Sequence, residues 1–219
     1  ELVDFPLLRA VAATGKPVIM STGMAAWEEL REAVATLETA GCRELALLKC
    51  VSSYPATPAE MNLRNIPLLA SKFHVPIGLS DHTLGTDVAV ASVALGACLV
   101  EKHLTLSRAA GGPDASFSLE PKEFRQLVES VRSVEQALGS NEYRVSPREA
   151  ANRKLRRSLY LTADVPAGAP LEAGQIQALR PAEGLPPRYL SQVLGRRARR
   201  DLLRGTPLTW DLLEPVPEG

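Results

Sequence analysis

The sequence predicts an α/β protein in which a parallel sheet covered by helices is followed by a small β-rich domain. Over residues 1–139, four short apolar strands alternate with amphipathic helices, and polar residues follow the end of each strand. In the rest of the chain, glycine and proline separate short strand-like pieces. Uniformly apolar strands indicate burial on both faces, which is typical of a parallel sheet.

The elements of the first part have recognisable start and stop signals. Gly15, Gly41 and Gly139 each follow a helical pattern, where a left-handed C-terminal cap is common, and Pro121 occupies the first turn of the last helix. Hydrophobic spacing predicts helices at residues 4–14, 27–40, 62–73, 86–95 and 121–138. Short apolar runs predict strands at residues 17–20, 45–48, 76–79 and 98–100.

The change of composition after Gly139 predicts the domain organisation. Residues 140–154 are polar and basic and are expected to be a linker, and residues 155–219 are expected to form the β-rich domain. Both (β/α)₈ barrels and open doubly wound sheets place polar residues at strand ends. No glycine-rich phosphate-binding fingerprint follows a strand, so a nucleotide-binding fold is less favoured.

The charge balance argues against a nucleic acid or a membrane as partner. The 219 residues carry 25 Lys and Arg against 25 Asp and Glu, so no global field attracts a polyanion. The basic run at residues 195–200 lacks interleaved aromatics and is expected to be a solvated or ion-paired face. The longest apolar stretch, residues 88–100, is too short to span a bilayer. The three cysteines are odd in number and lack paired spacing, which indicates reduced thiols in a cytoplasmic protein.

Two of the three histidines, His82 and His103, end adjacent predicted strands at the same level. Neighbouring strands lie about 4.8 Å apart, so two such imidazoles can share a divalent ion whose other positions stay open for water or substrate. Alternatively, each histidine is simply a hydrogen-bonded strand-end residue. The pairing, with Asp81 and Glu101 beside it, favours the metal site.

Further polar side chains are expected near the same strand ends. Glu101 and Asp114 could each act as a general base or hold sugar hydroxyls, and Asp114 could equally be a solvated loop acid. Hydroxyl groups at three strand ends suit phosphate or carboxylate oxygens, although singly they are more often helix N-caps. These hydroxyl residues are Ser21, Thr22, Ser52, Ser53 and Ser80.

Two strand-end lysines, Lys49 and Lys102, could meet an anionic substrate. Successive residues of a strand face opposite sides, so one member of each adjacent pair must point outward. Glu101 and His103 share a face, and Lys102 is therefore expected to point away from it.

Several motifs resemble one enzyme family. Three strings resemble the C-terminal half of the barrel in the sialic acid synthase family: PVIMSTGM (residues 17–24), GLSDHTL (78–84) and EKHLT (101–105). That family condenses phosphoenolpyruvate with an N-acetylated amino sugar. Three further strings look most like the pseudaminic acid synthase branch of this family: LKCVSSYP (48–55), GGPDASFSLEP (111–121) and RRSL (156–159). The final segment, with LRP (179–181) and GTPL (205–208), resembles the family's antifreeze-like (SAF, β-clip) domain.

This resemblance implies the second half of a TIM (β/α)₈ barrel followed by the antifreeze-like domain. Four barrel units, and the lysines with which the family holds phosphoenolpyruvate, have no counterpart in the chain, which lacks an initiator Met and is expected to be a fragment. Half a barrel leaves open sheet edges. The isolated chain is therefore expected neither to turn over nor to stay soluble as a monomer.

The resemblance also implies roles for individual residues. His82 and His103 would coordinate a divalent metal, typically Mn²⁺ with Mg²⁺ or Co²⁺ as alternatives, and Glu101 would lie near the reacting carbons. Ser21, Ser52 and Ser80 would contact phosphoenolpyruvate, although the sialic branch has Asn where this chain has Ser52. Tyr54 and Asp114 would line the sugar side, and Asp81 would also bind substrate. In a domain-swapped homodimer, Arg180 would reach the sugar bound by the partner.

The activity that the resemblance implies is pseudaminic acid synthesis from phosphoenolpyruvate, water and a diacetamido trideoxy altrose. The loop at residues 111–117 favours this branch. N-acetylneuraminate and legionaminate synthases are the alternatives within the family. A non-catalytic sugar- or partner-binding module is the alternative of a different class, if the chain is complete.

Overall fold

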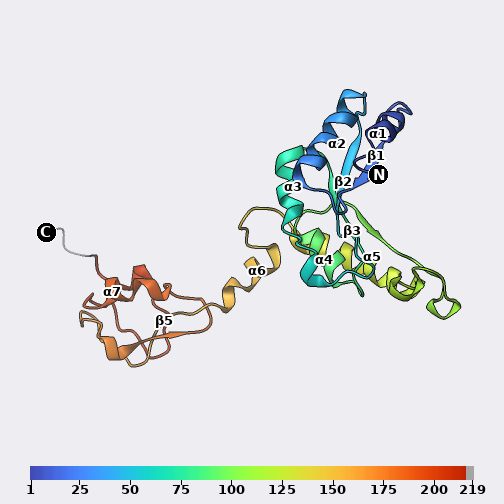
Figure 1. Ribbon diagram of the computed structural model, residues 1–219. Helices are drawn as coiled ribbons and strands as arrows, with labels where there is room; N and C mark the ends of the chain where they lie inside the picture. The colour runs from blue at the N-terminus through green and yellow to red at the C-terminus, as the bar shows by residue number, and fades with distance from the viewer. Residues whose placement is uncertain (216–219) are drawn as a thin grey trace. The chain divides into compact units, whose positions relative to one another are not determined.

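The computed structural model describes residues 1–215 and divides into two compact units (Figure 1). The first unit runs from Glu1 to Ser140, and the second begins at Asn141. Each unit has a hydrophobic core of its own, which makes each a separate packing unit.

The first unit contains a four-stranded parallel sheet in the order β1-β2-β3-β4, as predicted. Its strands are β1 (Val18–Ser21), β2 (Leu45–Cys50), β3 (Ile77–Asp81) and β4 (Val100–Lys102). The last strand begins at Val100 rather than at residue 98, and it extends into the polar residues. The reason is its pairing with β3, in which Ser80 lies opposite Glu101 and Asp81 opposite Lys102.

Helices accompany the strands at nearly the predicted positions (Figure 1). They are α1 (Phe5–Ala12), α2 (Trp27–Thr39), α3 (Asn65–Phe73), α4 (Asp87–Ala94) and α5 (Pro121–Leu138). Helix α3 begins later than the predicted residue 62 because Asn62 has a left-handed backbone, with φ 42°. Within residues 1–215, no helix has both the length and the apolar character needed to cross a bilayer.

The sheet has two faces with different chemistry. Leu47 of β2 packs in a buried cluster with Leu37 of α2 and Ile66 of α3, on what we call the outer face. The alternate residues, such as Cys50 and Ser80, line a cavity on the opposite, inner face. Strand alternation thus separates a hydrophobic outer face from a polar inner one.

The second unit is built around two antiparallel strands, β5 (Ser158–Leu161) and β6 (Ile176–Leu179). Short helices α6 (Pro147–Ala151) and α7 (Leu190–Val193) complete it, and α6 lies in the segment expected to be a linker. Its core consists largely of leucine and valine side chains: Leu159, Leu161, Val165, Leu171, Leu185, Val193, Leu202, Leu208, Leu212 and Leu213.

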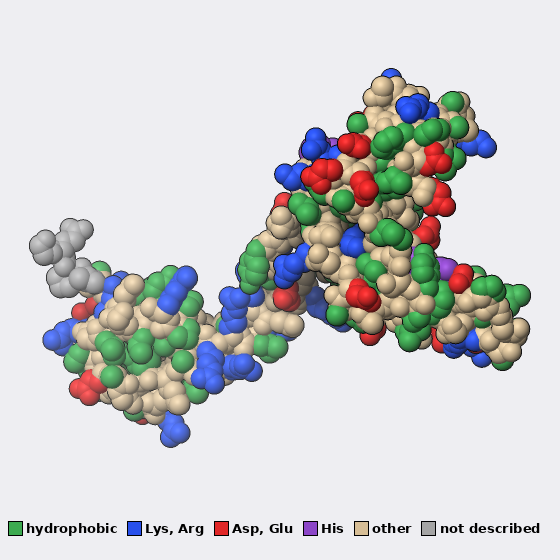
Figure 2. All heavy atoms as spheres, in the orientation of Figure 1, with side chains coloured by type: hydrophobic (Ala, Val, Ile, Leu, Met, Phe, Trp, Pro, Cys, Tyr) green, Lys and Arg blue, Asp and Glu red, His purple; other side chains and the backbone are tan. Residues whose placement is uncertain are grey.

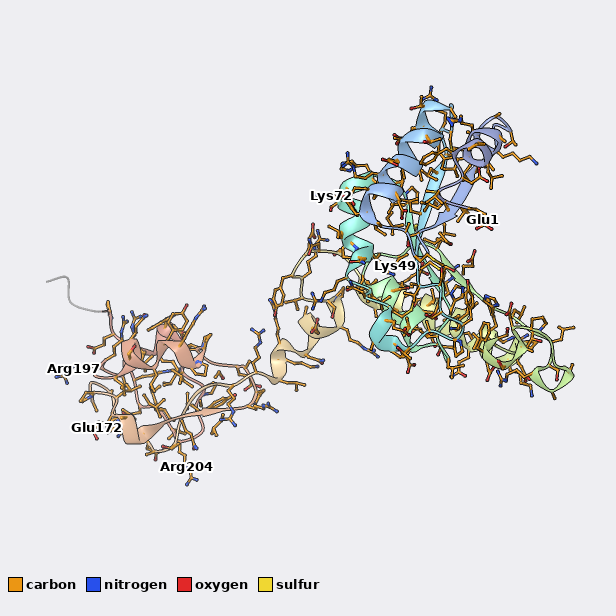
Figure 3. The ribbon with its side chains drawn as sticks, viewed as in Figure 1. Glu1, Lys49, Lys72, Glu172, Arg197 and Arg204 are labelled. Carbon is orange, nitrogen blue, oxygen red and sulfur yellow. The ribbon has the colours of Figure 1, made fainter. Side chains whose placement is uncertain are left out.

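The basic run at residues 195–200 takes part in the packing of the second unit. Many Lys and Arg side chains are visible on this unit in Figure 2. Nε of Arg196 donates to the Gln192 carbonyl at 2.9 Å, Nη1 of Arg197 (labelled in Figure 3) to Gly168 at 2.6 Å, and Nε of Arg199 to Leu213 at 2.8 Å. Three of these guanidinium groups are thus held by backbone carbonyls.

Candidate functional site

A cavity of about 710 Å³ lies on the inner face, at the carboxyl ends of the four strands. Most of the predicted site residues line it: Ser21, Ser52, Tyr54, Ser80, His82, Glu101 and His103. Parallel strands place their carboxyl ends at one edge of the sheet, which explains why residues far apart in sequence meet there.

Two serine hydroxyls of the cavity have close neighbours from other strands or turns. Oγ of Ser80 donates a hydrogen bond of 2.7 Å to Oε1 of Glu101 on the neighbouring strand. Ser52 lies against the turn after β1, since a Cβ on Gly23 would stand only 3.2 Å from its Oγ. Hydroxyl and carboxylate groups are thus brought together from separate strands, and Glu101 is oriented by a charge-assisted hydrogen bond.

His82 directly follows β3, and its ring is oriented by a backbone carbonyl. Nδ1 of His82 lies 2.8 Å from the carbonyl oxygen of Val51, which only accepts hydrogen bonds. Nδ1 therefore carries the hydrogen, and Nε2 is left as the nitrogen that can bind a ligand. This is the arrangement commonly found behind metal-binding histidines.

His103 faces His82 within an aromatic wall. The two imidazole centres are 5.2 Å apart with an interplanar angle of 73°. The ring of Tyr54 lies 4.2 Å from His82, and that of Phe117 lies 5.1 Å from His103. Asp114 stands next to His103, with Oδ2 3.7 Å from Nδ1, too far for a direct hydrogen bond.

The spacing of the two histidines fits one divalent ion. With metal–nitrogen bonds of about 2.1 Å and an angle of about 90–110° at the metal, the ring centres of two imidazoles on one ion lie about 4.6–5.3 Å apart. The observed 5.2 Å falls in this range. Among residues 1–215 there is no group of three or more His, Cys, Asp or Glu side chains suited to a metal. An ion here would therefore have two protein ligands and open positions.

The Tyr54 hydroxyl is a hydrogen-bond donor at the cavity wall. Partial burial raises the pKa of this hydroxyl, and the nearby Cys50, Asp114 and Glu101 raise it further. Tyr54 thus stays protonated around neutral pH. A neutral phenol can donate to a sugar hydroxyl or carbonyl oxygen.

Asp81 occupies a place different from the expected one, because it is on the outer face and does not line the cavity. Its carboxylate is fully buried and bonds Nζ of Lys102 at 2.7 Å. It also accepts hydrogen bonds from the backbone N–H and the hydroxyl of Thr83. These partners belong to the chain itself, so the structure supports a structural role for Asp81 rather than substrate contact.

Arg180 lies outside the first unit. It follows β6 in the second unit, and its side chain is exposed. Its assignment to a sugar substrate stays a prediction.

Neither strand-end lysine lines the cavity. Lys102 points to the outer face, as alternation predicts, where its amine bonds Asp81. Lys49 (labelled in Figure 3) also lies on the outer face, and its amine donates to the Cys50 carbonyl at 2.7 Å. Burial lowers the pKa of Lys49.

The structure adds residues that the sequence did not single out. Cys50 and Gly23 line the cavity, and Phe117 packs on His103. Alternation from Leu48 would have placed Cys50 on the inner face with Ser80. Phe117 belongs to a short 3-10 turn, Ala115–Phe117, between β4 and α5, and hydrophobic spacing does not predict its contact with His103.

Family models match both units. The NeuB family model matches residues 1–143, and the SAF domain model matches residues 156–214. These matches confirm the predicted antifreeze-like domain and the predicted family resemblance.

Curated relatives are similar over nearly the whole chain. An uncharacterized protein of Methanocaldococcus jannaschii is 43% identical, with 96% of this chain and 63% of the relative covered. The N,N'-diacetyllegionaminic acid synthase of Legionella pneumophila is 38% identical (98% and 62% covered), and the pseudaminic acid synthase of Helicobacter pylori is 37% identical (98% and 63% covered). The chain thus spans less than two thirds of the length of these relatives.

A solved structure shows the same architecture. The spore coat polysaccharide biosynthesis protein SpsE of Bacillus subtilis matches with a TM-score of 0.60 and 34% identity, covering 99% of this chain and 66% of the other. The first unit is accordingly a parallel half-barrel, and the second is a small antifreeze-like domain. From the family match and the shared fold, we conclude that the chain belongs to the NeuB family.

Proposed function

We propose that this chain forms the metal-binding and sugar-facing part of a phosphoenolpyruvate-dependent synthase whose product is pseudaminic acid. The observation that carries the proposal is the cavity in which His82, His103 and Glu101 lie together with serine hydroxyls from other strands. Family membership supports the reaction class. The activity belongs to the whole protein, of which this chain corresponds to less than two thirds in its relatives.

The sugar is the least constrained part of the proposal. The segment GGPDASF at residues 111–117, which carries Asp114 and Phe117, supports the pseudaminic branch. Legionaminic acid is the second candidate, because the Legionella relative is 38% identical against 37% for the Helicobacter relative. N-acetylneuraminic acid is a third.

The serine hydroxyls would bind the anionic substrate. Ser21, Ser52 and Ser80 line the cavity from three strand ends and would donate to phosphate and carboxylate oxygens. The sugar would lie toward Tyr54 and Asp114, where a protonated phenol and a carboxylate can hold its hydroxyl and amide groups. Hydrogen bonds from fixed donors orient the two reactants before bond formation.

In the proposed reaction, C3 of phosphoenolpyruvate bonds to the aldehyde carbon of the open-chain sugar and water adds at C2. The aldehyde oxygen takes up one proton and becomes a hydroxyl. The C2–O bond to phosphate then breaks, phosphate leaves with the electron pair, and the C2 hydroxyl loses its proton to give the ketone. Glu101, oriented by Ser80, would stabilise positive charge at C2 or accept the proton of the water. A divalent ion held by His82 and His103, Mn²⁺ by expectation, would polarise the aldehyde oxygen when bound.

The proposal includes a homodimer in which the antifreeze-like domain of one copy covers the cavity of the other. Arg180 from a second copy would then donate two hydrogen bonds to the sugar, a geometry that Lys could not reproduce. Sedimentation velocity of the purified protein tests the dimer, and a single monomeric species at micromolar concentration would contradict it.

The test of the function is phosphate release from phosphoenolpyruvate with Mn²⁺ and one sugar at a time. It is run on the protein as translated from its gene. Turnover with the diacetamido trideoxy altrose is the expected result. Turnover with only N-acetylmannosamine or only the legionaminic precursor would overturn the choice of sugar, and sugar binding without turnover of any of them would favour the non-catalytic module.

A further inference from the structure

A buried ion pair lies directly behind the two histidines, on the outer face of the sheet. Nζ of Lys102 is 2.7 Å from Oδ2 of Asp81, and the two side chains are 1% and 0% exposed. The two residues occupy paired positions of β4 and β3. Each immediately precedes a histidine, since Asp81 is followed by His82 and Lys102 by His103.

The same ammonium group holds the chain on both sides of His82. Besides Asp81, Nζ of Lys102 donates to the backbone carbonyl of Thr83 at 2.7 Å. Asp81 in turn accepts from the Thr83 backbone N–H at 2.9 Å and from its hydroxyl at 2.7 Å. His82 is thus enclosed between two residues that bond each other and the lysine next to His103.

Stability alone is a weak explanation for this arrangement. Removing two charges from water is expensive, and a well-packed apolar pair of similar size is often as stable as a buried ion pair or more so. What an ion pair adds is a fixed relative position of the groups that bear it. Here those groups are the two strand ends from which the imidazoles project into the cavity.

We propose that Asp81 and Lys102 are positioning residues that fix the 5.2 Å separation of the His82 and His103 rings. This inference rests on the proposed function only in that the two histidines bind a divalent ion. Neither residue lines the cavity, so both act through the backbone of their neighbours. Asp81 and Lys102 thereby contribute to metal affinity without touching the metal.

The experiment compares metal affinity with stability in three variants. Lys102→Met and Asp81→Asn each leave a buried partner unpaired, whereas the double variant removes both charges. We expect each single variant to lower the melting temperature, and the double variant to recover most of the loss seen in Lys102→Met. Mn²⁺ affinity, measured by electron paramagnetic resonance titration, should fall about 10- to 100-fold and stay low in the double variant.

Recovered stability with lost affinity is the outcome that a merely structural role would not give. The matched control is Arg132→Gln/Glu135→Gln, which removes an exposed ion pair from the same unit and should leave Mn²⁺ affinity unchanged. His82→Ala gives the baseline for a lost ligand. If the double variant bound Mn²⁺ with wild-type affinity while His82→Ala lost it, the positioning role would be overturned and the metal site would stand. Unchanged affinity in His82→Ala would overturn the metal site itself, and this inference with it.

Discussion

Ser80 and Glu101 face each other across β3 and β4, and the Ser80 hydroxyl donates a 2.7 Å hydrogen bond to Oε1 of the carboxylate. The two residues come from paired positions on the inner face of the sheet. The hydroxyl therefore selects one orientation of the carboxylate in the cavity, and the orientation of Glu101 can be tested separately from its charge.

In the whole protein, with the proposed synthase activity, Ser80→Ala should lower kcat for phosphate release by about tenfold, the effect of losing one hydrogen bond to a charged group. Glu101→Gln keeps the shape but removes the charge, and it should lower kcat further. Ser53→Ala is the matched control, because Ser53 comes from the neighbouring segment but does not line the cavity. Equal kcat values for Ser80→Ala and the wild type would show that the hydrogen bond does not orient Glu101 for catalysis.

His103→Ala should weaken Mn²⁺ binding by more than about 100-fold, beyond the usual effect of losing a supporting partner. The control is His74→Asn, since His74 lies outside the cavity and has a left-handed backbone, with φ 52°, that Asn tolerates. Titration followed by electron paramagnetic resonance measures both. If the two variants bound Mn²⁺ equally well, His103 would not be a ligand.

The segment that carries Asp114 is anchored to α5 by Arg108 and Glu123. Nη2 of Arg108 donates to Oε1 of Glu123 at 2.9 Å. Arg108, and then the Glu120 backbone N–H, lower the pKa of the Glu123 carboxyl to about 2. This carboxyl has a lower pKa in the folded state than in the unfolded one, so its contribution to stability is present above about pH 4.3 and is lost as the pH falls toward 2.

Arg108→Gln should therefore raise the pKa of Glu123 toward its ordinary value of about 4.3. Carboxyl-detected nuclear magnetic resonance titration measures this shift. Arg132→Gln, which removes an arginine paired with Glu135, should leave Glu123 unchanged. A Glu123 pKa still near 2 in Arg108→Gln would contradict the assigned cause.

Gly184 is required in the second unit because backbone atoms surround it. A Cβ at this position would lie 2.8 Å from the carbonyl oxygens of Leu159 and Leu208. Gly184→Ala should therefore lower the free energy of unfolding by about 1–3 kcal/mol.

Gly174→Ala is the matched control in the same unit, since a Cβ there meets nothing within 4 Å. It should change the free energy of unfolding by less than about 0.5 kcal/mol. Chemical denaturation of both variants decides between them, and similar values for the two would refute the packing argument.

Much of the fold was predictable because its signals are local. Apolar runs with glycine caps predicted the strands and helices of the first unit, and strand-end polarity predicted that His82 and His103 meet. Alternation correctly placed Lys102 on the outer face. The same alternation would have placed Asp81 on the outer face as well, because Asp81 adjoins the cavity-facing His82.

Other features depend on contacts that the sequence does not announce. The Val51 carbonyl that orients His82 lies 31 residues away and carries no side-chain signal. The position of Phe117 against His103 depends on how the segment between β4 and α5, which contains the 3-10 turn Ala115–Phe117, folds back. The start of α3 depends on the left-handed backbone of Asn62, which hydrophobic spacing alone did not reveal.

The alternation of the β3 peptide has a consequence for altering the protein by directed evolution. Ser80 and His82 face the cavity, whereas Leu79, Asp81 and Thr83 are buried on the outer face. Cavity-facing positions and positions buried in the outer-face packing are therefore interleaved, one residue apart. A library that varies only positions 80 and 82 would change the cavity lining and leave the outer-face packing intact, whereas Gly78 has to be kept because a Cβ there would lie 2.6 Å from the Leu99 carbonyl oxygen.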